Sequence, residues 1–170
     1  MFHRFSGVSF GGVACAQYWC DFVLWETVLN ANPELTGIVE IGTFMGGFSH
    51  YLNAQAQARG MKFVTYDAIV PEATIPEFTR LDVFAYPGRV KDWAESCGGP
   101  VILFCDGGNK PRELSLFPPL MPEHSVYLVH DWGTEMLGSD VPEFLDEIYG
   151  DYCDSIGSVT RVFRMREETE

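Results

Sequence analysis

The stretch GIVEIGTFMGGFSHYL, residues 37–52, decides the fold. Its apolar start is typical of a buried β-strand, and residues 48–58 have the apolar spacing of a helix. Gly42, Gly46 and Gly47 stand between the two, where a side chain would block whatever approaches the backbone. A helix start offers unpaired N–H groups and the positive end of a dipole. This strand, turn and helix therefore predict a small-molecule site.

Apolar runs and alternation predict the remaining elements. The predicted strands are residues 37–41, 62–66, 80–83, 100–105, 125–129 and 158–165, and the predicted helices are residues 18–29, 48–58, 88–95, 112–117 and 139–149. Strands buried on both faces and alternating with helices predict an α/β fold with a doubly wound sheet. The alternating pattern of the last strand fits a sheet edge. A length of 170 residues predicts one domain, residues 1–170.

The charge of the chain limits its possible partners, and its cysteines indicate where it is located. The chain has 24 acidic and 11 basic residues, a formal net charge of −13. Such a surface repels a phosphate backbone and anionic lipids, so we expect neither nucleic acid nor a membrane as partner. Five cysteines without a CxxC pair predict reduced, mostly buried thiols, and residues 1–12 lack the pattern of a signal peptide. A cytoplasmic protein is therefore expected.

Acidic residues stand at the ends of four predicted strands. They are Asp67, Asp82, Asp106 and Asp131. Ligands of open α/β sheets bind beyond the carboxyl ends of the strands. One buried carboxylate is ordinary, but packing alone does not explain a row of them at that edge. The row is the strongest sign of a ligand site in this sequence.

The glycine turn leaves three interpretations open. It could be a connector without a ligand, although two glycines would suffice for that. It could bind a dinucleotide, because Asp67 lies 20 residues after Gly47, but the glycines read G-x-x-x-G-G and miss part of the G-x-G-x-x-G fingerprint. The third interpretation is an S-adenosylmethionine site, which has no phosphate to satisfy.

A family resemblance favours the third interpretation. The residues Glu40-x-Gly42-Thr43-x-x-Gly46-Gly47-x-Ser49, with Asp67 closing the next strand, resemble the first two motifs of class I S-adenosylmethionine-dependent methyltransferases. EIGTFMGGFSHYL, VILFCDGGNKPREL and YLVHDW together resemble the cephalosporin hydroxylase and macrocin or rhamnosyl O-methyltransferase group, from about Gln17 to Trp132. The resemblance implies a Rossmann-like, mostly parallel, seven-stranded sheet whose last strand is antiparallel.

The resemblance also implies the residues that bind S-adenosylmethionine. They are Glu40, Gly42, Thr43, Phe44, Met45, Gly46, Gly47, Ser49, Asp67, Asp82 and Asp106. The glycine loop would wrap the methionine moiety, and Asp67 would accept both ribose hydroxyls. Asp82 would lie near the adenine edge or cap a turn. Glu40 would orient the loop or be a satisfied buried carboxylate.

A second set of residues resembles the family's catalytic positions. Asp106, His130 and Asp131 match positions that hold a divalent cation in the related O-methyltransferases. Such an ion, Mg²⁺ or Mn²⁺, prefers oxygen ligands and lowers the pKa of a bound hydroxyl. His130 replaces a carboxylate, which favours Mn²⁺ over Mg²⁺, or it is a hydrogen-bonded core histidine. Asn109 replaces a histidine base and cannot take a proton. Lys110 would steady an oxyanion or pair with acidic neighbours.

The resemblance therefore implies O-methylation of a hydroxyl on a small molecule or sugar. No Lys or Arg is obviously assigned to Asp106 and Asp131, which adds to the expectation of a metal. The alternatives are a cofactor-binding module without methyl transfer, favoured by His130 and Asn109, and an NAD-dependent oxidoreductase. With about 37 residues before the first core strand, a partner subunit, such as a second copy, could supply a substrate cap. Tyr18 and Trp19 could line the pocket, but we expect both to pack in the core.

Overall fold

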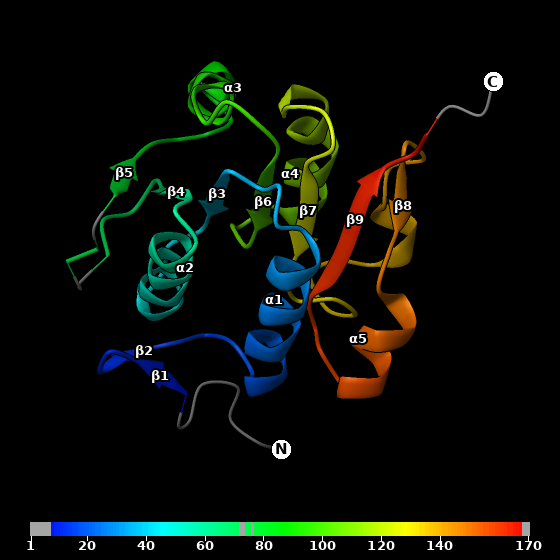
Figure 1. The fold of residues 1–170 in the computed structure, drawn as a ribbon, viewed down its shortest axis with the longest axis horizontal. Helices are drawn as coiled ribbons and strands as arrows, with labels where there is room; N and C mark the ends of the chain where they lie inside the picture. The colour runs from blue at the N-terminus through cyan, green and yellow to red at the C-terminus, as the bar shows by residue number, and fades with distance from the viewer. Residues whose placement is uncertain (1–7, 72–73, 76, 168–170) are drawn as a thin grey trace.

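A computed structural model describes residues 8–71, 74–75 and 77–167, and a seven-stranded sheet forms its centre (Figure 1). The strand order is β5-β4-β3-β6-β7-β9-β8. The strands are β3 (Gly37–Ile41), β4 (Lys62–Asp67), β5 (Phe78–Arg80), β6 (Val101–Cys105), β7 (Val126–Val129), β8 (Leu145–Glu147) and β9 (Arg161–Met165). A separate hairpin consists of β1 (Ser9–Phe10) and β2 (Val13–Ala14).

Helices cover both faces of the sheet (Figure 1). The α-helices of the described residues are α1 (Trp19–Ala31), α2 (Gly47–Ala58), α3 (Pro87–Ser96), α4 (Lys110–Leu116) and α5 (Gly150–Ile156), and the 3₁₀ turns are η1 (Pro118–Leu120) and η2 (Gly138–Asp140). Because strand side chains alternate, Ile38 and Phe104 pack with α1, α2 and α5, whereas Val39 and Leu103 pack with α3 and α4. The predicted doubly wound α/β fold is confirmed.

Strand β9 runs against its neighbours, antiparallel to both β7 and β8. The prediction of a last antiparallel strand is confirmed, but its placement at the edge is wrong, because β8 lies outside it. In β8, Leu145 is buried, and the exposed Asp146 pairs with Arg166 at 2.8 Å. A short strand with charged residues is a common way to end a sheet.

The helix predicted over residues 139–149 is wrong. That segment contains η2 and β8, and the helix α5 begins only at Gly150. Pairing with β9 buries Leu145, and this tertiary contact outweighs a weak local preference for helix.

The strand predicted over residues 80–83 is also misplaced, because β5 ends at Arg80. The Asp82 Oδ1 atom accepts from the N–H groups of Phe84 and Ala85, at 3.0 and 3.2 Å. This turn takes the chain out of the sheet.

The register of the parallel strands brings two of the predicted acidic residues, Asp67 and Asp106, to one level. Ile41 pairs with Tyr66 on one side and with Cys105 on the other, and Cys105 pairs with Val129. The next residues of these four strands therefore meet at one edge of the sheet, and they are Gly42, Asp67, Asp106 and His130.

Three further expectations concern the cysteines, membranes and the N-terminus. All five cysteines are unpaired, and Cys15, Cys105 and Cys153 are buried, as predicted. Within the ranges that the structure describes, no helix has the length and apolar character needed to cross a bilayer. Residues 1–7, which contribute to the signal-peptide interpretation, lie outside the described residues.

Candidate active site

A pocket of about 390 Å³ opens at the carboxyl edge of the sheet. Its carboxylates are Asp67, Asp82, Asp106, Glu113, Asp131 and Glu135. Among the described residues that line it there is no lysine or arginine, and His130 is the one basic side chain. Tyr18, Phe44, Tyr66 and Phe84 add aromatic surface. Such a wall favours a ligand that carries positive charge and a flat apolar group.

The predicted cofactor residues divide between this pocket and a smaller one. Gly42, Phe44, Asp67, Asp82 and Asp106 line the large pocket. Glu40, Thr43, Met45, Gly46 and Gly47 line an adjoining cavity of about 20 Å³. Ser49 is fully buried and lines neither of them, because its hydroxyl donates to Glu40 Oε2.

Two glycines of the loop are required by the protein's own backbone. Gly42 has φ +100°, and a Cβ atom on it would lie 2.3 Å from the carbonyl oxygen of Asp106. A Cβ atom on Gly47 would lie 2.3 Å from the carbonyl oxygen of Ala14 in β2. The space that these residues leave is therefore filled by neighbouring chain segments. Gly46, with φ +85°, precedes the first residue of α2.

Asp67 ties the glycine loop to the end of β4. Its Oδ2 atom accepts from the N–H groups of Thr43 and Phe44, both at 3.1 Å, and its Oδ1 atom accepts from the Ile69 N–H at 2.9 Å. The carboxylate also lines the large pocket. Its predicted contact with ribose hydroxyls stays a prediction, and the structure adds a second role in shaping the loop.

Glu40 lies beneath the loop as a buried carboxyl group. It is 1% exposed and accepts from Ser49, and burial raises the pKa of Glu40 to about 8. This is the satisfied buried group that the sequence left as one alternative. Glu40 also lines the smaller cavity, so the other alternative, that Glu40 orients the loop, stays a prediction.

His130 is a buried histidine surrounded by carboxylates. Its Nδ1 atom lies 3.2 Å from Asp106 Oδ1 and 3.5 Å from Asp131 Oδ2, and its Nε2 atom lies 3.7 Å from Asp21 Oδ2. Burial lowers the pKa of a histidine, but these carboxylates raise the pKa of His130 to about 12. The hydrogen bond from His130, together with Lys110, holds the pKa of Asp131 well below its usual range.

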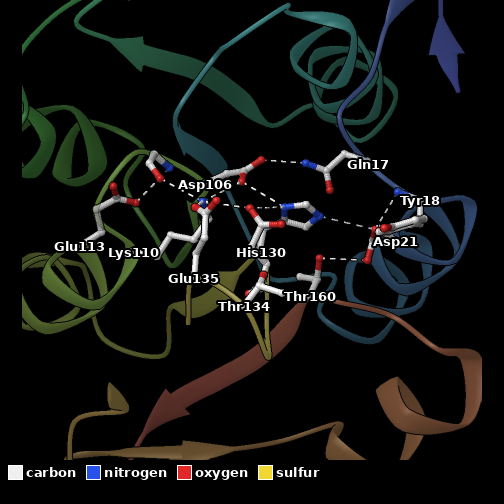
Figure 2. A network of polar contacts seen from close by, with 12 residues as sticks. Gln17, Tyr18, Asp21, Asp106, Lys110, Glu113, His130, Thr134, Glu135 and Thr160 are labelled. Carbon is white, nitrogen blue, oxygen red and sulfur yellow. Dashed lines mark hydrogen bonds and ion pairs between the residues drawn. The ribbon is translucent and has the colours of Figure 1, made fainter. Parts of the chain in front are cut away.

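Lys110 balances the same carboxylates from the other side (Figure 2). Its Nζ atom lies 3.5 Å from Asp106 Oδ1, 3.2 Å from Asp131 Oδ2 and 2.9 Å from Glu135 Oε2. Burial lowers the pKa of a lysine, yet these charges raise the pKa of Lys110 above its usual range. The expectation that no lysine or arginine serves the two aspartates is wrong, and the interpretation of Lys110 as a partner of acidic neighbours is confirmed.

The predicted metal ligands do converge. Ligand atoms of Asp106, His130 and Asp131 all lie within 4.8 Å of one another. However, the oxygens that a divalent ion would use, Asp106 Oδ1 and Asp131 Oδ2, already face the Nζ atom of Lys110. With Lys110 in place, this donor set does not fit a divalent ion.

Asn109 and Trp19 lie in other surroundings than the sequence predicts. Asn109 is not among the lining residues, and its Oδ1 atom accepts from the Arg112 N–H at 3.2 Å as the N-cap of α4. Trp19 is 62% exposed, so its predicted core packing is wrong, whereas Tyr18 lines the pocket ahead of α1.

Four site residues could not be found from the sequence. Gln17 donates to Asp106 Oδ2 at 2.7 Å, Asp21 accepts from Ser158 and Thr160, Glu135 pairs with Lys110, and Glu113 accepts from the N–H groups of Gly107 and Asn109. The available signal was weak: Asp21 and Glu113 are acidic residues in the first turn of a helix, a position common for capping alone.

Comparisons with known proteins support the architecture. A solved cmcI structure with SAH matches with a TM-score of 0.69 and 13% identity, covering 98% of this chain and 86% of that chain. A cmcI structure with Mg-SAM matches with a TM-score of 0.56 and 14% identity, covering 76% of this chain and 59% of that chain. No family model and no curated protein matches the sequence. The chain therefore has the seven-stranded, methyltransferase-type α/β fold of these cmcI structures.

Proposed function

We propose that the protein transfers a methyl group from S-adenosylmethionine to a hydroxyl group of a small molecule. The observation that carries this proposal is the acidic pocket beside the glycine loop, which has no lysine or arginine among its described lining residues. The fold adds support, because the two cmcI structures contain SAH and Mg-SAM.

The charge of the pocket distinguishes between the cofactors considered. S-adenosylmethionine carries a sulfonium and an ammonium against one carboxylate, so its net charge is positive. A nicotinamide dinucleotide brings a pyrophosphate, which needs cations or a helix N-terminus close to it. The six carboxylates that line the pocket outnumber the basic side chains beside them, His130 and Lys110, so the pocket would repel that group. The pocket therefore favours the sulfonium cofactor over NAD.

The chain supplies the groups that would orient this cofactor. The loop at residues 42–47 would hold the methionine end, and Asp67 at the end of β4 would hold the ribose. Asp82 and the Phe84 ring lie in the wall of the same pocket, where the adenine would bind. Asp106 and Asp131 would then face the sulfonium end, where the acceptor enters.

In the transfer, the bond between carbon and sulfur breaks as the carbon bonds to the acceptor oxygen, and the hydroxyl proton must leave. Asp131 is a weak base, because His130 and Lys110 hold its pKa low. Burial raises the pKa of Glu113 to about 7, which suits a base near neutral pH, and Glu113 lines the pocket. Glu113 is our candidate for the proton acceptor, and this role requires one of its oxygens to release the N–H group of Gly107 or Asn109. One of the similar cmcI structures contains Mg-SAM. A bound Mg²⁺ would act as a Lewis acid on the acceptor oxygen, but the transfer proposed for this protein does not require it.

A second candidate is a module that binds the cofactor without transferring its methyl group. Two observations favour it, and the first is that Asp106 is held by Gln17, Lys110 and His130 within the protein. Asn109, at the family's base position, caps a helix instead.

Direct binding measurements test the proposal. Calorimetry with S-adenosylmethionine, S-adenosylhomocysteine and NAD⁺, each in chelator, should show binding of the first two alone. Transfer of labelled methyl to a panel of sugars and other small hydroxyl compounds then tests catalysis. Binding of NAD⁺ in place of the sulfonium compound would overturn the proposal, and tight binding without transfer to any acceptor would favour the module.

A further inference from the structure

The Nζ atom of Lys110 lies in a cage of four oxygens. In addition to the three carboxylates, it donates to the carbonyl oxygen of Gly107 at 3.0 Å. The side chain is 4% exposed, although it belongs to the first turn of a short surface helix. A buried ammonium is stable only where opposite charges and hydrogen bonds compensate its lost hydration, and here they do.

The carboxylates of this cage are themselves fixed from outside it (Figure 2). Gln17 donates to the Oδ2 atom of Asp106, which leaves the Oδ1 atom directed at Lys110 and His130. Asp131 has a φ of +59°, an uncommon conformation for a residue other than glycine. Such a backbone is retained where the surrounding contacts determine it. The cage is therefore a built arrangement and not a chance surface pair.

The cage and a divalent ion exclude each other. Oxygen ligands of Mg²⁺ lie at about 2.0–2.1 Å from the ion. An ion held by Asp106 and Asp131 would then lie next to the Lys110 ammonium, which contacts both carboxylates. Two like charges at that separation in a buried site repel strongly.

We propose that the ammonium of Lys110 is the resident cation of this cluster, so that a divalent metal binds there only when Lys110 is removed. The lysine holds Asp106 and Asp131 in place and acts as a positioning residue, since it is not among the residues that line the pocket. The inference goes beyond methyl transfer and does not depend on the identity of the cofactor.

The test is a titration of the purified chain with Mn²⁺, followed by electron paramagnetic resonance, without cofactor. We compare the unchanged protein, Lys110→Met and the matched control Lys91→Met, whose exposed side chain pairs with Glu95 at 3.5 Å. The unchanged protein and Lys91→Met should bind Mn²⁺ weakly. Lys110→Met should bind it about 100-fold more tightly or better, because Asp106, Asp131 and Glu135 lose the ammonium group that contacts all three. Adding Asp131→Asn to Lys110→Met should remove the gain.

Two outcomes would overturn the proposal. One is micromolar Mn²⁺ binding to the unchanged protein that Asp131→Asn abolishes, since the lysine would then not exclude the ion. The other is a folded Lys110→Met or Lys110→Gln variant with no gain in affinity. If neither variant folds by circular dichroism, the titration of the unchanged protein decides: weak binding supports the proposal and tight binding rejects it. Calorimetry with S-adenosylmethionine is a separate measurement, so a failure of the proposed cofactor binding can be told apart from a failure of the proposal about Lys110.

Discussion

Gly42 and the carbonyl group of Asp106 are in contact across two neighbouring strands. A Cβ atom on Gly42 would lie 2.3 Å from that oxygen, and the residue has φ +100°. The first glycine of the loop therefore permits the ends of β3 and β6 to approach each other. A ligand is not needed to explain it.

Gly42→Ala should destabilise the fold itself. We expect a loss of about 2–4 kcal/mol in the free energy of unfolding, from the positive φ and the steric clash. Urea unfolding measures it. The matched control is Gly88→Ala in α3, where a Cβ atom meets nothing within 4 Å. Equal stability of the two variants would show that the loop can relax.

Asp67→Asn should weaken binding of S-adenosylmethionine. Loss of an ionised acceptor costs on the order of 2–4 kcal/mol in binding free energy, because hydrogen bonds to charged groups contribute about 1.5–3 kcal/mol each. Asn keeps one oxygen for the N–H groups of Thr43 and Phe44, so the fold should survive better than in Asp67→Ala. Calorimetry with Asp146→Asn as control checks this. Unchanged affinity would remove Asp67 from the binding site.

Salt should weaken the binding of S-adenosylmethionine more than the binding of S-adenosylhomocysteine. The two differ by the sulfonium charge, which the carboxylates of the pocket attract, and salt screens that attraction. The ratio of their affinities should therefore fall as ionic strength rises. Calorimetry of both ligands at low and high salt gives the ratio. A ratio independent of salt would mean that the pocket does not recognise the charge.

Glu40→Gln should reduce the pH dependence of stability. Because burial raises the pKa of Glu40 from 4.5 to about 8, the folded state binds a proton that the unfolded state has released between these values. Stability from this group is therefore full below pH 4.5 and lost as pH rises toward 8. The loss is on the order of 3–5 kcal/mol at most. Denaturant unfolding at pH 5.5 and 8 compares the two proteins, and parallel pH profiles would contradict the assignment.

The sequence was most informative where the chain is buried on both faces. The strands β6 and β7 are continuous apolar runs, and β3 is interrupted only by Glu40; such runs are recognisable without tertiary information. The errors lie at the edges of the sheet, in β5 and β8, which are three residues each. There, pairing with a neighbour outweighs local preference, and no local pattern shows the neighbour.

The site residues also divide into those that a local sequence pattern predicts and those that it does not. The strand-end aspartates follow directly from the end of an apolar run, so their shared edge was predictable. Contacts between distant segments were not, as with Gln17 and Asp106, which are 89 positions apart. The pairing of Lys110 with acidic neighbours was predicted as one alternative, but the identity of its partners was not, because Asp131 and Glu135 come from a different loop.

The hairpin of β1 and β2 bears on how the chain can be handled experimentally. The Ala14 carbonyl packs on Gly47 at the start of α2, and Ala16 and Tyr18 belong to the wall of the large pocket. The N-terminal arm therefore lies against the proposed binding site. A fusion partner or deletion near β1 would therefore disturb both the wall of the pocket and the packing of Phe10 on Tyr51, whereas the last strand, β9, ends away from the pocket and is the safer point of attachment.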